Sequence, residues 1–177
     1  TNIDCNGNSG GSITTIVTPL VGSTLPFTYL WSNGETTQSI FNLTAGQYCL
    51  TVTDANGLFQ IDCFDVVEPD VLVASVVGTD VSGMGIGDGS AVLNVSGGSL
   101  NYSCQWGTGT FVTGSADPFV DTQTGLYAGV YNVLVSDANG CTTVASDSVN
   151  SLAPWTVDPT AISHLIHIPQ NAVITLD

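Results

Sequence analysis

Hydrophobic and polar residues alternate with a period of two through most of the chain, in short runs that are separated by turn residues. The clearest runs are SITTIV, FTYLWS, QYCLTVT, AVLNVS and YNVLVS, which are rich in β-branched and aromatic residues. Asn-Gly recurs between these runs, and both residues tolerate the positive φ of a hairpin turn. No segment has a convincing helical period. The pattern therefore predicts an all-β protein built as a β-sandwich.

The same landmarks occur twice along the chain. Tyr131 follows Tyr48 by 83 residues (131 − 48), and the two Asp-Ala-Asn-Gly turns have the same spacing. Trp106 follows Trp31 by only 75 (106 − 31), so the second copy contains eight extra residues (83 − 75). They fall in GTFVTGSADPFV and predict a longer loop or an added hairpin. We expect a first domain at residues 1–69, a second at 70–152 and an extended tail at 153–177.

The aromatic landmarks predict the two cores. A tryptophan on a central strand of a sandwich packs between the sheets, and a tyrosine entering a late strand matches the tyrosine corner of immunoglobulin-type domains. Trp31 with Tyr48, and Trp106 with Tyr131, are therefore the expected core anchors.

The charge balance excludes several functions. The 177 residues include 15 acidic residues and no lysine or arginine, which gives a formal net charge of −15. Nucleic-acid binding is excluded because nothing can neutralise phosphates, and attraction to an anionic membrane is excluded for the same reason. No apolar run reaches the roughly 18 residues that span a bilayer, so membrane insertion is not expected.

Several motifs together resemble one family. Asp-Cys-Asn-Gly, then PFTYLWSNG, then NLTAGQY, then VTDANG and finally Glu-Pro are similar to the SprB-type repeat, over roughly residues 2–150. The resemblance implies two tandem immunoglobulin-like β-sandwich domains, similar to PKD domains, in a secreted cell-surface adhesin of the Bacteroidota. It implies no catalytic residues. Leu58 departs from the pattern because the family often has cysteine there, and Val81 replaces the cysteine found at Cys5.

Five cysteines in an extracellular β-protein predict disulfides. With Asp54–Gly57 as a hairpin turn, Cys49 and Cys63 face each other across the two strands. Cys104 and Cys141 are the second expected pair. Cys5 is then left over, either to bridge to another chain or to remain a buried thiol.

Catalytic and metal sites have little support. Gly7–Gly11 fits the G-x-S-x-G pattern, but no strand precedes it and the two histidines, His164 and His167, lie in the tail. These histidines would point to opposite faces of a strand, so a metal pair is not expected. Loop aspartates make a structural calcium the one remaining possibility, and the weak candidates are Asp54, Asp80, Asp88 and Asp137. The other interpretation is that each of them caps its own turn.

The tail suggests how subunits associate. It contains two apolar segments, and a sandwich edge accepts an added strand. The tail either pairs with another subunit, or closes its own second domain, or begins a third domain. The residues expected at such a contact are Ile162, Leu165, Ile166, Ile168, Val173, Ile174 and Leu176.

These observations predict a non-enzymatic, extracellular structural protein. The leading interpretation is a subunit of a surface filament or adhesin that self-associates into a homopolymer through β-strand contacts. The alternative is a carbohydrate-binding accessory module of a secreted protein, with surface glycans as partners. That alternative requires a planar row of exposed aromatic residues, for which Tyr102, Phe111, Phe119 and Tyr127 are the candidates.

Overall fold

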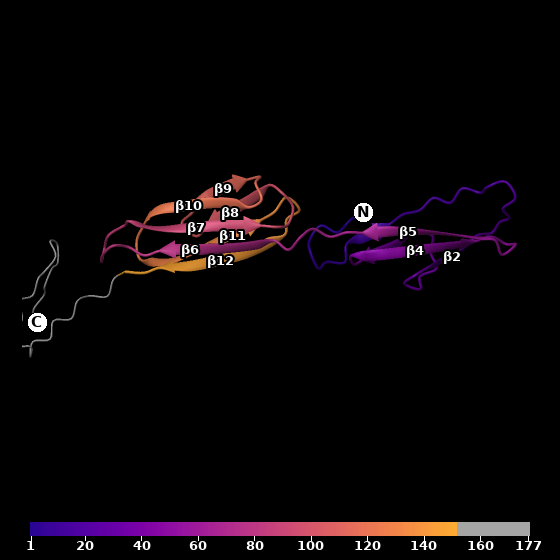
Figure 1. Ribbon diagram of the computed structural model, residues 1–177, viewed down its shortest axis with the longest axis horizontal. Helices are drawn as coiled ribbons and strands as arrows, with labels where there is room; N and C mark the ends of the chain where they lie inside the picture. The colour runs from indigo at the N-terminus through magenta and orange to yellow at the C-terminus, as the bar shows by residue number, and fades with distance from the viewer. Residues whose placement is uncertain (152–177) are drawn as a thin grey trace, which may run out of the picture.

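The computed structural model describes residues 1–151, which form twelve strands and no helix. The strands build two sandwiches that lie end to end, and the chain passes from one to the other between β5 and β6 (Figure 1). The all-β prediction is confirmed. The contacts expected of the tail, with His164 and His167, lie outside the described residues.

The second domain has the strand order of an immunoglobulin sandwich. One sheet has the order β10-β7-β6 and the other has the order β12-β11-β8-β9, with every neighbour antiparallel. These orders correspond to the A-B-E and G-F-C sheets of that fold. The strands are β6 (Val73–Thr79), β7 (Gly89–Ser96), β8 (Tyr102–Trp106), β9 (Phe111–Gly114), β10 (Phe119–Leu126), β11 (Gly129–Ser136) and β12 (Thr142–Val149).

The first domain repeats this arrangement with fewer strands. A two-stranded sheet, β1-β3, faces a three-stranded sheet in the order β2-β4-β5. By position, β1 and β3 match β7 and β10 of the second domain. β2, β4 and β5 match β8, β11 and β12. Within residues 1–151, no strand of the first domain matches β6 or β9. The strands are β1 (Gly11–Ile13), β2 (Thr28–Trp31), β3 (Ile40–Leu43), β4 (Gly46–Thr53) and β5 (Phe59–Val66).

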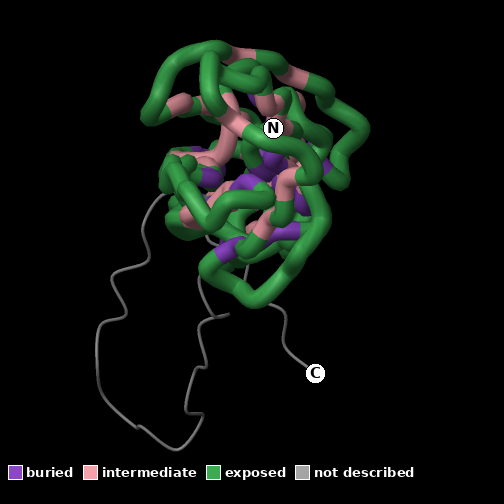
Figure 2. Tube along the Cα trace, turned by 90° about the vertical axis from the view of Figure 1, so that its right-hand side faces the viewer, coloured by how far each residue is buried: buried purple, intermediate pink, exposed green. Residues whose placement is uncertain are grey.

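Each domain closes around its own tryptophan. Trp31 and Trp106 are each 1% exposed, and the two clusters of buried residues share no member. In the view along the long axis of the molecule, the buried segments of the chain lie toward the centre and exposed segments surround them (Figure 2). Each indole N–H is satisfied: Trp31 Nε1 donates to the carbonyl of Thr37 at 2.8 Å, and Trp106 Nε1 donates to Asp121 Oδ2 at 2.9 Å. The buried polar atom of each ring therefore has a partner.

The two tyrosines sit at the edges of the cores. Tyr48 and Tyr131 are half-buried and pack against the buried clusters. Each hydroxyl donates to the carbonyl four residues upstream, Tyr48 to Thr44 at 3.0 Å and Tyr131 to Tyr127 at 2.9 Å. This is the hydrogen bond of a tyrosine corner, which fixes the loop before the strand.

The extra residues of the second copy form a hairpin. β9 pairs with β8 from Tyr102↔Gly114 to Gln105↔Phe111, which widens that sheet by one strand. The sequence left open a longer loop or an added hairpin, and the structure contains the hairpin.

Two of the four aromatic residues expected in a sugar-stacking row pack in or against the core, namely the buried Tyr102 and the half-buried Phe119. Tyr102 is 1% exposed, donates its hydroxyl proton to the carbonyl of Gly97 at 2.6 Å, and lies 6.3 Å from the ring of Phe119 between centroids. It alternates inward on β8 with Cys104 and Trp106, and so belongs to the core. Phe111 and Tyr127 are exposed. Carbohydrate binding stays a prediction, without the row that suggested it.

The buried tryptophans yield a stability test. Trp106→Ala should lower the free energy of unfolding of the second domain by about 3–5 kcal/mol, because the lost burial adds to the cost of the cavity. Val144→Ala, at an exposed position on β12, should change it by less than about 0.5 kcal/mol. Urea unfolding followed by circular dichroism measures both. Equal losses in the two variants would contradict a core centred on Trp106.

Candidate functional site: the junction between the domains

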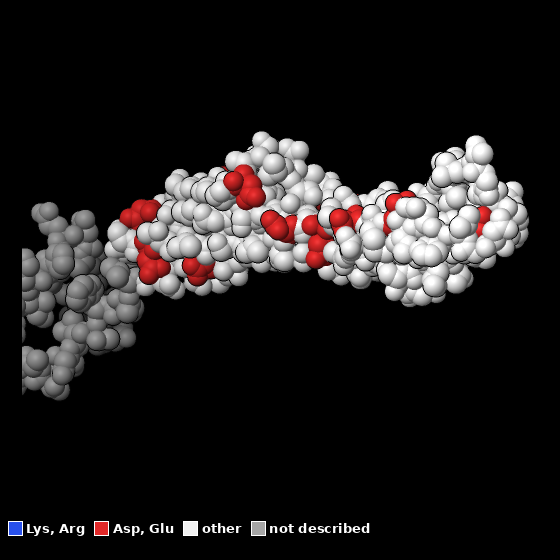
Figure 3. Space-filling model, turned by 45° about the vertical axis from the view of Figure 1, so that its right-hand side comes forward, with Lys and Arg blue, Asp and Glu red and all other residues white. Residues whose placement is uncertain are grey.

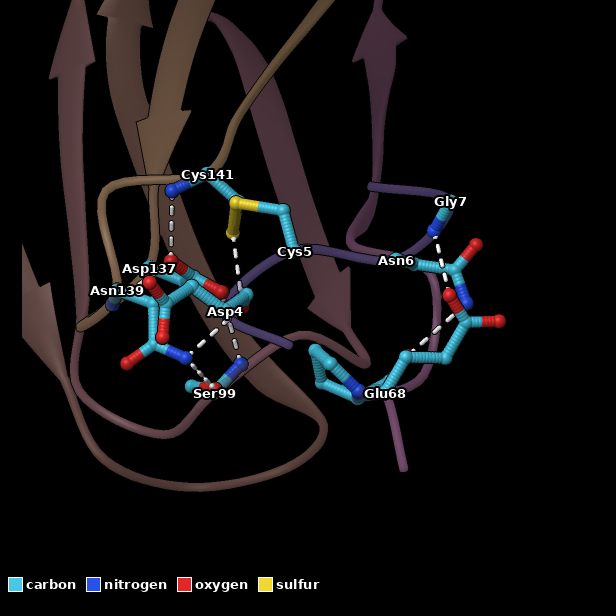
Figure 4. Close-up of a disulfide and its surroundings, with 10 residues drawn as sticks. Asp4, Cys5, Asn6, Gly7, Glu68, Ser99, Asp137, Asn139 and Cys141 are labelled. Atoms are coloured by element: carbon cyan, nitrogen blue, oxygen red, sulfur yellow. Dashed lines mark hydrogen bonds between the residues drawn. A yellow bond between two sulfur atoms is a disulfide. The ribbon is translucent and has the colours of Figure 1, made fainter. Parts of the chain in front are cut away.

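A covalent bond joins the two domains. Cys5 lies in the N-terminal segment before β1, and Cys141 ends the turn between β11 and β12; the two form a disulfide with a Cα–Cα distance of 5.7 Å. They are 136 residues apart in the sequence. Figure 4 shows the loop of the first domain reaching the turn of the second at this bond.

This pairing corrects part of the expected cysteine chemistry. Cys104 was expected to bond to Cys141, but its side chain is fully buried among the core residues of the second domain and is unbonded. Burial, with a smaller effect of Asp121, raises the pKa of the Cys104 thiol. Cys5 is not left over for another chain, because Cys141 is its partner.

The other expected pair is present in the structure. Cys49 and Cys63 are register partners on β4 and β5 and form a disulfide with a Cα–Cα distance of 4.0 Å. The hairpin register that predicted this pair holds along the whole of the two strands.

Polar contacts reinforce the interdomain disulfide on the side of the second domain. Asn139 Nδ2 donates to the carbonyl oxygen of Asp4 at 2.9 Å and to Ser99 Oγ at 2.8 Å. The sulfur of Cys141 lies 3.3 Å from the same Asp4 carbonyl, a contact without a proton because the sulfur is in a disulfide. The loop of the first domain is thus held by two residues of one turn (Figure 4).

The linker between the domains holds the same loop from its other side. Asn6 Nδ2 donates to the carbonyl of Pro69 at 3.0 Å, and the backbone N–H of Gly7 donates to Glu68 Oε2 at 2.6 Å. A hydrogen bond to a charged acceptor is stronger than one between neutral groups. The junction therefore has three attachments, namely the peptide linker, the disulfide and these hydrogen bonds.

The turn that carries Cys141 is shaped by an aspartate. Asp137 Oδ1 accepts from the backbone N–H groups of Asn139 at 2.9 Å and Cys141 at 2.8 Å, and Oδ2 accepts from Ser99 N–H at 2.9 Å. An Asp side chain that bonds the backbone ahead of it stabilises a tight turn. This turn fixes the direction in which the Cys141 side chain points.

The first domain contains the same turn without the cysteine. Asp54 Oδ1 accepts from Asn56 and Leu58 N–H, each at 2.9 Å, and Oδ2 accepts from Thr24 N–H at 3.1 Å. Burial alone would raise the pKa of Asp54, but backbone N–H donors, with Thr24 and Leu58 the strongest, hold it below its ordinary value. Leu58 stands at the position of Cys141.

The aspartates proposed as calcium ligands serve as turn and loop acceptors. Besides Asp54 and Asp137, Asp80 Oδ1 accepts from Asn150 N–H at 2.8 Å and Asp88 Oδ1 accepts from Ser82 N–H at 2.9 Å. Across residues 1–151, no three His, Cys, Asp or Glu side chains are grouped so as to hold a metal ion. On the face shown in Figure 3, acidic side chains are spread over both domains, with several near the junction. A structural calcium stays a prediction.

The disulfide changes the path that a pulling force takes. The shortest covalent path from Thr1 to Ser151 crosses from Cys5 to Cys141 and then follows β12, so residues 6–140 are bypassed. β12 runs away from the first domain along the length of the second (Figure 1) and is already extended. Covalent bonds therefore carry the tension along this path. Unfolding residues 6–140 would not increase the distance between Thr1 and Ser151.

The comparisons with known proteins agree with this class of repeat protein. Residues 1–36 match the family model of the SprB repeat, so the resemblance noted from the motifs is confirmed over that stretch. No curated protein matches the chain. None of the described residues forms a helix with the length and hydropathy needed to cross a membrane.

Several solved structures are similar to the chain. Three of them are an amphioxus IgVJ-C2 molecule (16% identity, 82% of this chain and 99% of that one, TM-score 0.37), the BSP domain of a biofilm-associated protein (20%, 72% and 25%, 0.30) and the four N-terminal immunoglobulin domains of Dscam1 isoform 1.9 (15%, 84% and 43%, 0.37). All three TM-scores are below 0.5, so the immunoglobulin-type assignment depends on the strand order of the second domain.

The Asp54 turn has a testable pH dependence. Because the folded-state pKa of Asp54 is lowered, its carboxylate stabilises the fold above its ordinary pKa of about 3.9, and this stabilisation is lost as the pH falls through the lowered value. Asp54→Asn should lower the unfolding temperature at pH 7 and make its decline between about pH 4 and pH 2 shallower. Glu35→Gln is the control, because within the described chain the Glu35 carboxylate accepts no hydrogen bond. An unchanged acid profile in Asp54→Asn would contradict this role.

Proposed function

We propose that this protein is an extracellular structural module, a subunit of a surface filament or adhesin whose subunits join through β-strand contacts. The SprB repeat at residues 1–36 supports this class. Two disulfides support an oxidising location outside the cytosol. The absence of lysine and arginine removes every cleavage site for trypsin-like proteases, which suits an exposed protein.

The observation that carries the proposal is the Cys5–Cys141 bond. A protein that only presents a binding surface has no need to bond one domain covalently to the next. A protein under tension benefits, because neither sandwich unfolds while the load passes through Cys5, Cys141 and β12. The module then acts as a stiff spacer of fixed length, and this structural role involves no reaction.

Single-molecule pulling between the two chain ends tests this role. The oxidised protein should show no unfolding of residues 6–140 before the attachment breaks. The double variant Cys5→Ser with Cys141→Ser should unfold under load and gain on the order of 400 Å, from about 3.3–3.6 Å per released residue with the Cys49–Cys63 loop still closed.

The matched control removes the other disulfide. Cys49→Ser with Cys63→Ser leaves the interdomain bond in place and should remain as inextensible as the parent protein, because both residues lie in the bypassed segment. If the parent protein and the Cys5/Cys141 double variant extend equally, the load-bearing role is wrong.

A further inference from the structure

The connection between β1 and β2 is much longer than its counterpart in the second domain. It contains 14 residues (27 − 13), whereas the connection between β7 and β8 contains five (101 − 96). Figure 1 shows it as an irregular trace that runs to the outer end of the first domain. Connections of this length without strands or helices are uncommon in compact domains. The second domain closes its sandwich with five residues here, so closure does not require the longer connection.

Hydrogen bonds attach this connection to the rest of the first domain at two points. Thr15 Oγ1 donates to the Gln38 carbonyl at 2.7 Å, and Gln38 Nε2 donates to the Thr15 carbonyl at 2.8 Å. Thr24 N–H donates to Asp54 Oδ2 at 3.1 Å, and Ala55 N–H donates to the Thr24 carbonyl at 2.9 Å. Thr15 is therefore attached to the segment before β3, and Thr24 is attached to the turn between β4 and β5.

The segment between these two attachments, Ile16–Ser23, is not supported in this way. Its hydrogen bonds within the described part of the chain run from Ser23 N–H and Oγ to the Leu20 carbonyl, at 3.0 and 2.7 Å. Ile16 is 88% exposed, Leu20 is 80% exposed and Val21 is 109% exposed. Both the side chains and the backbone of this segment are therefore accessible to an enzyme.

An accessible backbone outside any strand ladder is a site for proteolysis. A protease binds its substrate as an extended chain, and exposed loop tips are preferred places for a cut. Val130 and Val144 are also exposed, at 72% and 67%, but their backbones are paired in the β11–β12 ladder. Exposure of the side chain alone therefore does not distinguish Val21 from these valines. The unpaired backbone does.

The residue types of the segment decide which proteases can act on it. The chain has no lysine or arginine, so trypsin-like enzymes have no site, and residues 5–34 contain no acidic residue. The side chains of Ile16, Val17, Leu20 and Val21 are aliphatic. The segment therefore suits a protease whose specificity pocket accepts a small aliphatic side chain.

The position of the segment along the chain decides what a cut would do. Ile16–Ser23 lies between Cys5 and Cys141, which are bonded to each other. Hydrolysis of the bond between Val21 and Gly22 adds one water across the amide, leaving a carboxylate on Val21 and an amino group on Gly22. Residues 1–21 then stay bonded to the rest of the chain through the disulfide.

The first domain keeps its packing on both sides of such a cut. β1 remains paired with β3, from Gly11↔Leu43 to Ile13↔Ile40. Among residues 1–151, no member of the buried cluster around Trp31 lies in the segment. The attachments at residues 15 and 24 flank the segment and do not depend on it. A cut would therefore remove no core contact and no strand pairing.

We propose that Ile16–Ser23 is a cleavage site for extracellular proteases that act beside small aliphatic residues, and that the Cys5–Cys141 bond keeps the cut module covalently continuous. The path from Thr1 through this bond to β12 does not pass through the segment, so the cut module still carries tension. This last step rests on the proposed load-bearing function. The place of the cut and the retention of the fragment are measured without force and do not rest on it.

Limited proteolysis with elastase tests the site. Mass spectrometry of the products should place the first cut within residues 1–151 in Ile16–Ser23. Leu20→Asp with Val21→Asp should slow this cut at least about tenfold, because an apolar specificity pocket does not accept a carboxylate. Met84→Asp with Ile86→Asp, in the exposed loop between β6 and β7, adds the same charge and should be cut at the parental rate. A first cut elsewhere in residues 1–151, or equal slowing in both variants, would overturn the site.

Retention of the fragment is tested on the cut protein after the protease is inhibited. In denaturant, the N-terminal fragment should stay attached until a reductant is added. From the double variant Cys5→Ser with Cys141→Ser, denaturant alone should release it. The control variant Cys49→Ser with Cys63→Ser should retain it, because both of those cysteines lie in the same product. Release from the parent protein in denaturant alone would contradict the covalent continuity.

Pulling between the chain ends separates this inference from the proposed function. The cut, oxidised protein should lengthen no more than the intact protein does. Lengthening of the cut protein alone would overturn the claim that cleavage leaves the load path intact. Lengthening of both would overturn the load-bearing function, while the cleavage site and the retained fragment would stand on the proteolysis results.

Discussion

No carboxylate of this chain can pair with a lysine or an arginine, because the sequence contains neither. Aspartates in the described residues meet this constraint by accepting backbone N–H groups. Asp147 does so between strands, accepting from Gly78 N–H at 2.9 Å and from Ser148 N–H, and these bonds lower its pKa. Acidic residues therefore define turns and strand edges here, where in other domains they would form ion pairs.

The same constraint explains why the junction is covalent. Domains in one chain are often attached through a modest polar interface that leaves them free to move. Without cations, ion pairs are not available to stiffen that interface, and Glu68 reaches only the N–H of Gly7. The Cys5–Cys141 bond removes the freedom that such an interface leaves, and the Asp137 turn holds Cys141 in the position that makes the bond possible.

Local patterns predicted what depends on local geometry. Strand alternation and spacing placed Trp31 and Trp106 in separate cores, and hairpin register paired Cys49 with Cys63. The bond between Cys5 and Cys141 joins separate domains, and no strand register links residues that far apart. Cys104 and Tyr102 were misplaced although they lie two and four residues before Trp106, because the alternation that put Trp106 in the core was not applied to them; it places all three on the same buried face of β8. The turns at Asp54 and Asp137 are alike, but only the second carries a cysteine, and this difference was the signal that could have pointed to the junction.

That single difference between the turns has a mechanical consequence. Cys141 can form a permanent bond, whereas Leu58 at the matching position can offer only apolar contact. Burial of a leucine contributes about 1.5–3 kcal/mol, far less than a covalent bond, so any contact that Leu58 made could form and separate, while the Cys5–Cys141 bond persists. In the proposed filament, tension would therefore separate neighbouring copies before it unfolded the domains of one copy. The folded domains would survive a load that separates the copies, and the separated ends could join again.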